Sequence, residues 1–161
     1  MDLLDRFLGH DAWTTKQLLL LCEDLTDDEL DRDFDIGHRT VRATFHHVIY
    51  NMEGWSDLMA GKPIRTDERR SVPGLIARLD CAADDLAAVA RSVAARQAWD
   101  ERWLDPNNNA PVERTYGGTI AHVITHSMHH RAQLLYLLRR LGVKDLPEGD
   151  VLSWEHQLPQ V

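Results

Sequence analysis

The sequence is poor in the residues and patterns that mark several large classes of protein. Its 161 residues include only two cysteines, Cys22 and Cys81, which form no C-x-x-C motif. We therefore expect reduced, buried thiols and a reducing cytoplasm. No apolar run approaches the roughly 18 residues of a membrane span, and the acidic opening MDLLDRFLGHDAW lacks the apolar core of a secretory signal. These absences argue against a disulfide scaffold, a membrane protein and a secreted protein.

Positive charge and common catalytic motifs are also scarce. The chain has 18 lysines and arginines against 26 aspartates and glutamates, a formal net charge of −8. Phosphate contact needs clustered Lys and Arg, so we expect no nucleic-acid partner. The sequence contains no nucleophile elbow, P-loop or dinucleotide-binding glycine motif. No expected helix carries the Glu-x-x-His pair of a ferritin-like di-iron centre.

Four segments carry the periodicity of amphipathic helices. They run from about Leu3 to Leu25, Thr40 to Met59, just after Gly74 to Arg96, and Gly118 or Thr119 to Leu141. The residues that flank the Asn-rich turn at 105–109 alternate weakly, a pattern that is compatible with a short hairpin. We predict an all-α fold in which a single domain, residues 1–161, forms an antiparallel four-helix bundle. The tail 144–161 is expected to be an extended cover.

Histidine is abundant, with nine residues, and the last helical segment carries it where an apolar face is expected. The apolar stripe of this segment consists of Ile120, Val123, Leu134, Leu137, Leu138 and Leu141. At about 100° per residue, His126 and His130 fall inside that stripe, one turn apart. Their i, i+4 spacing lets both rings reach one ion. Hydrogen bonds to polar neighbours in the core are the alternative, because buried imidazoles need some partner.

Two other helical segments bring polar residues to the same depth. His47 and Asn51 share one flank of the segment 40–59, from which His47 can supply a third ligand. Asp11 and Thr14 interrupt the apolar stripe of the first segment, and a buried carboxylate can accept a hydrogen bond from a metal-bound imidazole. Three neutral imidazoles leave an ion with an open position, as in catalytic sites. There the ion lowers the pKa of bound water or thiol, or polarises a carbonyl.

These motifs resemble the DinB-like family of metal-binding four-helix bundles. The resemblance covers nearly the whole chain and rests on LGHDAWTTKQLL, DFDIGHRTVRATFHHV, HVIYNMEGW and GGTIAHVITHSMHHRAQLLYLLRRLG. It implies a divalent ion held by His47, His126 and His130, with water completing the shell. Similar proteins include bacillithiol S-transferases and mycothiol-dependent maleylpyruvate isomerases, and they are often homodimers.

The chain departs from the family pattern at two positions. Ala132 replaces a common Gly, and His38 stands where a small polar residue is usual. Neither residue belongs to the implied histidine triad. These departures bear on the substrate more than on the ion.

The leading hypothesis is a cytoplasmic, metal-dependent enzyme that carries out thiol-dependent S-transfer or metal-assisted hydrolysis on a small molecule. Its ion would be zinc or nickel first, and iron or manganese next, since imidazole suits several metals. Asp11 and His122 are the candidates for orienting ligands or handling protons. The predicted pocket is lined by Trp13, Asn51, Trp55 and Gln133. The expected partners are a small-molecule substrate, a low-molecular-weight thiol and a second copy of the chain.

Two other hypotheses stand beside this one. The first is a non-catalytic protein that stores or senses a metal, or sequesters a small molecule. A closed site, with a fourth protein ligand such as Asp11 and no pocket, would favour it. The second is a metal-free helical dimer whose histidines lie in the core.

Overall fold

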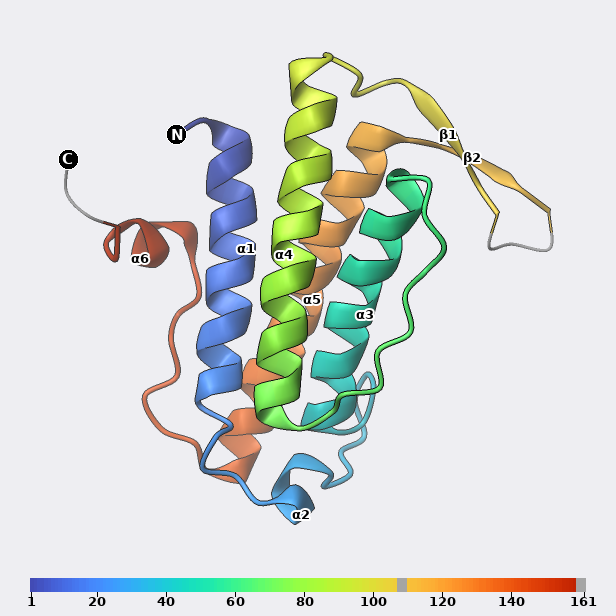
Figure 1. Cartoon of the computed structure of the whole chain (residues 1–161). Helices are drawn as coiled ribbons and strands as arrows, with labels where there is room; N and C mark the ends of the chain where they lie inside the picture. The colour runs from blue at the N-terminus through green and yellow to red at the C-terminus, as the bar shows by residue number, and fades with distance from the viewer. Residues whose placement is uncertain (107–109, 159–161) are drawn as a thin grey trace.

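The computed structural model describes residues 1–106 and 110–158, and the predicted all-α class is confirmed. The elements are α1 (Leu3–Leu20), α2 (Asp27–Leu30), α3 (Val41–Met59), α4 (Val72–Ala95), β1 (Arg102–Asp105), β2 (Val112–Thr115), α5 (Tyr116–Leu141) and α6 (Val151–Glu155). Part of the Asn-rich turn expected at 105–109 lies outside the described residues. The four long helices α1, α3, α4 and α5 form the body of the molecule (Figure 1).

Side-chain caps explain where the long helices begin and end. The side chain of Ser71 accepts a hydrogen bond from the backbone N–H of Gly74, so α4 begins at Val72, slightly earlier than the sequence predicted. Thr115 caps α5 in the same way, and that helix starts at Tyr116. The left-handed residue Gly142, with φ +87°, ends α5 as predicted. By contrast, α1 ends at Leu20, five residues before the predicted Leu25.

The long helices do not alternate in direction as the sequence predicted. Neighbours α1 and α4 are antiparallel, as are α3 and α5, but α3 runs parallel to α4 and α1 runs parallel to α5 (Figure 1). The fully antiparallel arrangement is therefore wrong. The segment 60–71 permits this course, because its twelve residues can span about 40 Å when extended. The helix α3 is only about 28 Å long, so this segment returns the chain to the end where α3 began.

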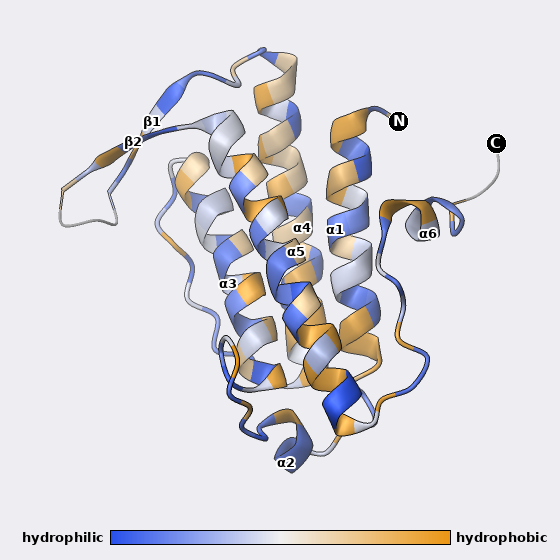
Figure 2. Cartoon of the chain, turned by 180° about the vertical axis from the view of Figure 1, so that it is seen from behind, coloured by the Kyte–Doolittle hydropathy of each residue, from blue (hydrophilic) through white to orange (hydrophobic). Residues whose placement is uncertain are grey.

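A continuous apolar core fills the space between the four helices. Leu18, Phe45, Leu79 and Leu134, one from each helix, are all at most 1% exposed. Figure 2 shows that α5 interrupts this pattern, with hydrophilic residues in its middle turns and hydrophobic ones toward its C-terminal end. The histidines of α5 lie in those middle turns. The histidines are thus set into one interface of an interior that is mostly apolar but also contains buried charged residues.

Two smaller elements extend from the helices. β1 and β2 pair as an antiparallel hairpin, as the sequence predicted, with Arg102 opposite Thr115. The tail is not wholly extended, because it contains α6, whose Trp154 is buried next to Gly9 of α1. Within residues 1–106 and 110–158, no helix combines the length and apolarity needed to cross a membrane.

Candidate metal centre

His47 reaches the site from the flank of α3 that faces α5. The side chain of Thr40 caps α3 by accepting a hydrogen bond from the backbone N–H of Ala43. Phe45 and Val48 on either side are almost completely buried, which fixes the rotation of α3 against its neighbours. His47 itself is half-buried. The backbone position of His47 is therefore fixed, and its ring points toward α5.

His126 and His130 project from successive turns of α5 toward that ring. The Nε2 atom of His126 lies 3.1 Å from Nε2 of His47 and 3.2 Å from Nε2 of His130. The ring centroids of His47 and His130 are 4.7 Å apart. The structure therefore brings together the three histidines that the sequence analysis selected, although 79 residues separate His47 from His126.

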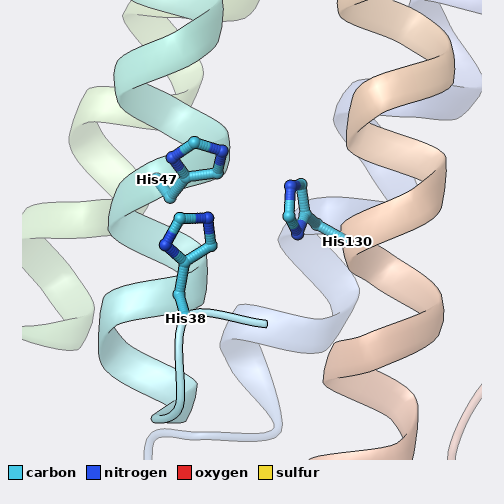
Figure 3. A group of neighbouring side chains, drawn as sticks. All are labelled: His38, His47 and His130. Carbon is cyan, nitrogen blue, oxygen red and sulfur yellow. The ribbon is translucent and has the colours of Figure 1, made fainter. Parts of the chain in front are cut away.

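A fourth imidazole joins this group. His38 belongs to the loop before α3, and one nitrogen of each of His38, His47 and His130 lies within 4.8 Å of the others. Figure 3 shows the rings of His38 and His47 one above the other, both beside His130. Sequence reasoning did not place His38 at the site, because a loop residue has no helical periodicity. Its only signal was the departure from the usual family residue.

A side-chain amide fixes the orientation of His130. The Oε1 atom of Gln133 accepts a hydrogen bond of 2.8 Å from Nδ1–H of His130. The amide nitrogen of Gln133 lies 3.1 Å from Nε2 of His129. With its Nδ1 protonated, neutral His130 presents the lone pair of Nε2 to the other rings. Gln133 is thus an orienting residue rather than the pocket-lining residue that the sequence suggested.

Burial keeps the three central imidazoles neutral. It lowers the pKa of His47 to about 4, and the charge that neighbouring histidines would carry adds to the effect. Burial also lowers the pKa of His126 to about 4. The pKa of His130 falls for the same reason, although its hydrogen bond with Gln133 opposes the shift. All three rings are therefore neutral near pH 7, the form in which imidazole binds metal ions.

The donor set fits a divalent metal ion. Two ligands on a tetrahedral zinc ion with Zn–N bonds of about 2.0–2.1 Å lie about 3.3 Å apart. The spacings of 3.1 and 3.2 Å around His126 are close to that value. Within the described part of the chain, buried Nδ1 of His126 has no hydrogen-bond partner, and its Nε2 atom is the one that faces the other two rings. The cluster contains imidazoles and no carboxylate, which suits zinc, nickel, copper or iron.

Asp11 has a different partner from the one expected. Its carboxylate pairs with the guanidinium group of Arg131, and both side chains are at most 5% exposed. Arg131 also donates to Oγ1 of Thr15 at 3.2 Å. The two residues join α1 to α5. The expected hydrogen bond from a histidine to Asp11 is therefore replaced by a buried ion pair.

His122 lies at the mouth of the site. Its ring centroid is 5.3 Å from that of His126 and 5.8 Å from that of Trp55. His122 and Trp55, with Arg114 and Thr119, line a hollow of about 380 Å³. His122 is exposed, one helical turn before His126. Its position is compatible with the proton-handling role suggested by the sequence.

The other predicted pocket residues separate into two places. Asn51 and Trp55 line a neighbouring hollow of about 500 Å³, and the buried Oδ1 atom of Asn51 has no hydrogen-bond partner in the described residues. Trp13 instead lines a hollow between α1 and the C-terminal segment, together with Pro147. Asn51 and Trp55 therefore share a hollow next to α3, the helix that carries His47. Trp13 lines a different hollow.

Comparison with known proteins agrees with this arrangement. No curated protein sequence matches the chain. A family model, that of the DinB family, matches residues 1–157 of the 161-residue chain. Because the match covers both helices that carry the histidines as well as nearly all of the remaining chain, the protein belongs to the DinB family.

Proposed function

We propose that this protein is a metal-dependent enzyme, built as a four-helix bundle, that activates a small thiol or a water molecule. The single observation that carries the proposal is the convergence of neutral imidazole nitrogens beside an open hollow. His47, His126 and His130 would hold the ion, with zinc or nickel as the leading candidates. When bound, such an ion lowers the pKa of a thiol or water ligand and supplies a nucleophile near neutral pH.

The surrounding residues would prepare the nucleophile and receive the substrate. Gln133 holds His130 in one tautomer by accepting from its Nδ1–H, as outer hydrogen bonds commonly do around metal sites. Trp55 offers an aromatic wall to the substrate, and exposed His122 can accept the proton released there. In the transfer reaction, the thiolate sulfur forms a bond to an electrophilic carbon of the substrate. The leaving group departs with the electrons of its old bond, and the thiol proton passes to His122 or solvent.

The metal site is tested by elemental analysis of protein purified without a histidine tag. Wild-type protein should retain about one equivalent of a divalent metal. The His126→Ala variant should retain much less, because it removes the nitrogen closest to both other rings. His156→Ala is the matched control, since it deletes an exposed histidine beyond α6. Equal metal content in wild type and His126→Ala would overturn the site.

The reaction is tested with thiols and a model electrophile. Low-molecular-weight thiols mixed with 1-chloro-2,4-dinitrobenzene should release chloride and form a thioether faster with metal-loaded protein than with the His126→Ala variant. An activated ester tests the hydrolytic version in the same way. If no thiol and no ester reacts above the metal-free background, the catalytic proposal fails even where the ion binds.

A second function is favoured by one observation, the presence of His38 beside the triad. A fourth imidazole can complete a closed shell, which is typical of structural or storage sites rather than catalytic ones. The protein would then bind a metal without turning over a substrate. Tight metal binding with no activity toward any thiol or ester would support this alternative.

A further inference from the structure

We propose that His38 is a fourth protein ligand of the ion, an inference that rests on the proposed metal site; a thiol or water would then reach the ion by displacing this loop ligand or as a fifth ligand. The observation that supports this is that the imidazole of His38, from a loop, lies next to the imidazoles of His47 on α3 and His130 on α5. The ring of His38 stacks on that of His47, with centroids 3.7 Å apart and an angle of 28° between the planes. Its centroid is 5.2 Å from that of His130. One nitrogen of His38 lies within 4.8 Å of a nitrogen of His47 and of His130, compared with about 3.3 Å between two ligands of a tetrahedral zinc ion.

The loop backbone is shaped to present His38. Gly37 and Arg39, the residues on either side, both have left-handed conformations, with φ of +52° and +71°. Arg39 has a Cβ atom, so this conformation is unfavourable for it. Backbone hydrogen bonds from Phe34 to Arg39 and from Thr40 to His38, each of 2.8 Å, hold the turn closed. Strained residues of this kind cluster at functional sites, where the surrounding structure holds them.

The same loop is packed against the residue that orients His130. A Cβ atom at Gly37 would collide with Oε1 of Gln133, the atom that accepts the hydrogen bond from His130. The absence of a side chain at position 37 therefore lets the loop approach α5 closely. His38 and His130 are positioned through one shared contact, which couples the loop to the helix ligand.

A purely structural role for His38 would leave the ion's surroundings unchanged when the ring is removed. A ligand role would change both the affinity and the coordination of the ion. Cobalt(II) distinguishes the two, because its visible spectrum depends on the number and type of its ligands. The experiment therefore compares the zinc dissociation constant and the cobalt(II) spectrum of tag-free protein for wild type, His38→Ala and His38→Gln. His47→Ala and His156→Ala serve as controls.

We expect both His38 variants to bind zinc at least about tenfold more weakly than wild type and to show altered cobalt(II) spectra. Added millimolar imidazole should restore the wild-type spectrum of His38→Ala, because free imidazole can fill the vacated position. His156→Ala should match wild type, and His47→Ala should show a larger loss. The thermal midpoint of metal-free His38→Ala should equal that of wild type, which separates ligand loss from misfolding.

The two proposals fail in different ways. If His38→Ala and His38→Gln keep the wild-type zinc affinity and cobalt(II) spectrum while His47→Ala loses both, the triad stands and the fourth ligand is overturned. If wild-type protein itself binds neither zinc nor cobalt(II), the proposed metal site is overturned and the role of His38 with it. Weaker zinc binding that imidazole does not reverse, with an unchanged cobalt(II) spectrum, would also overturn direct ligation by His38.

Discussion

Helix α5 presents two kinds of polar group to its two neighbours, from adjacent positions in the sequence. Arg131 faces α1, where the carboxylate of Asp11 neutralises it. His130 faces α3, where the nearest polar groups are other imidazoles. Both side chains are buried, at 4% and 7% exposure of the residue. Burial is therefore common to the two interfaces, and the chemistry of the partner is what differs.

The chemistry of the partner distinguishes a polar contact that stabilises the fold from a site that can bind an ion. A buried pair of opposite charges compensates its own charge, as Glu53 and Arg78 also do between α3 and α4, although Oδ2 of Asp11 has no hydrogen-bond partner in the described residues. Three Nε2 atoms converge between the imidazoles, and a hydrogen shared between two of them leaves the lone pair of the third free for a cation. Such a cluster could hold a metal ion. The α1–α5 interface should therefore matter for stability, and the α3–α5 interface for binding.

The largest effect on stability is expected at the α1–α5 interface, which contains the ion pair of Asp11 and Arg131. Asp11→Ala leaves the buried guanidinium of Arg131 without its counter-charge and should lower the free energy of unfolding by about 3–5 kcal/mol. Urea unfolding of metal-free protein, followed by circular dichroism, measures this loss. Asp5→Ala, which breaks the exposed pair with Arg91, is the control and should cost no more than about 1 kcal/mol. Similar losses in the two variants would remove the distinction.

The next effect belongs to the histidine side. Zinc at a free concentration of about 100 times its dissociation constant should raise the free energy of unfolding by about 2.7 kcal/mol, because only the folded chain assembles the site. The shift in urea midpoint on adding zinc or a chelator measures it. His126→Ala should lose this response, whereas Asp11→Ala should keep it if the chain remains folded. Loss of the zinc response in folded Asp11→Ala would mean that the α1–α5 interface also contributes to zinc binding, which contradicts the distinction between the two interfaces.

A smaller effect is expected where a neutral group supports the ligands. Gln133→Leu removes the acceptor for Nδ1–H of His130 and should weaken zinc binding by about 10- to 100-fold, the range seen for outer hydrogen bonds. Gln133→Glu keeps an oxygen acceptor and should retain the affinity. Competition with a chromophoric chelator gives both constants. Equal affinities in all three proteins would show that the amide does not orient His130.

The smallest expected effect comes from replacing either of two glycines that both have a left-handed backbone conformation. Gly37 and Gly61 both have positive φ, of +52° and +68°, but a Cβ atom meets Gln133 at position 37 and open space at position 61. Both alanine variants should lose about 1–2 kcal/mol of stability from backbone strain. Only Gly37→Ala should also weaken zinc binding. Unchanged zinc affinity in Gly37→Ala would mean that the loop can shift without disturbing α5.

Periodicity predicted the part of the site that lies on helices. His126 and His130 interrupt an apolar stripe at i, i+4 spacing, so a helical wheel alone places them together. His47 could be selected because it lies on the flank of the core stripe of α3, next to Phe45 and Val48, which are buried. Hydrophobic pattern determines which face of a helix is buried, and these three positions follow from it.

The remaining features depend on tertiary geometry that the pattern does not contain. Arg131 follows His130 directly and has a long side chain, so nothing local shows that it reaches Asp11 across the core. The left-handed turn that presents His38 is built by Arg39 as well as by Gly37, and arginine carries no signal for that conformation. The parallel course of α3 and α4 is permitted by the length of segment 60–71, which the predicted helix bounds already leave, but that length does not dictate the direction of α4.

The separation of 79 residues between His47 and His126 has a consequence for how the protein matures. During synthesis the N-terminal half emerges with four histidines, of which only His38 and His47 belong to the cluster. Only after the last long helix has docked do the remaining nitrogens arrive. If the proposed metal site exists, the ion would then bind only to a completely folded chain. Truncated chains would be released without a metal ion.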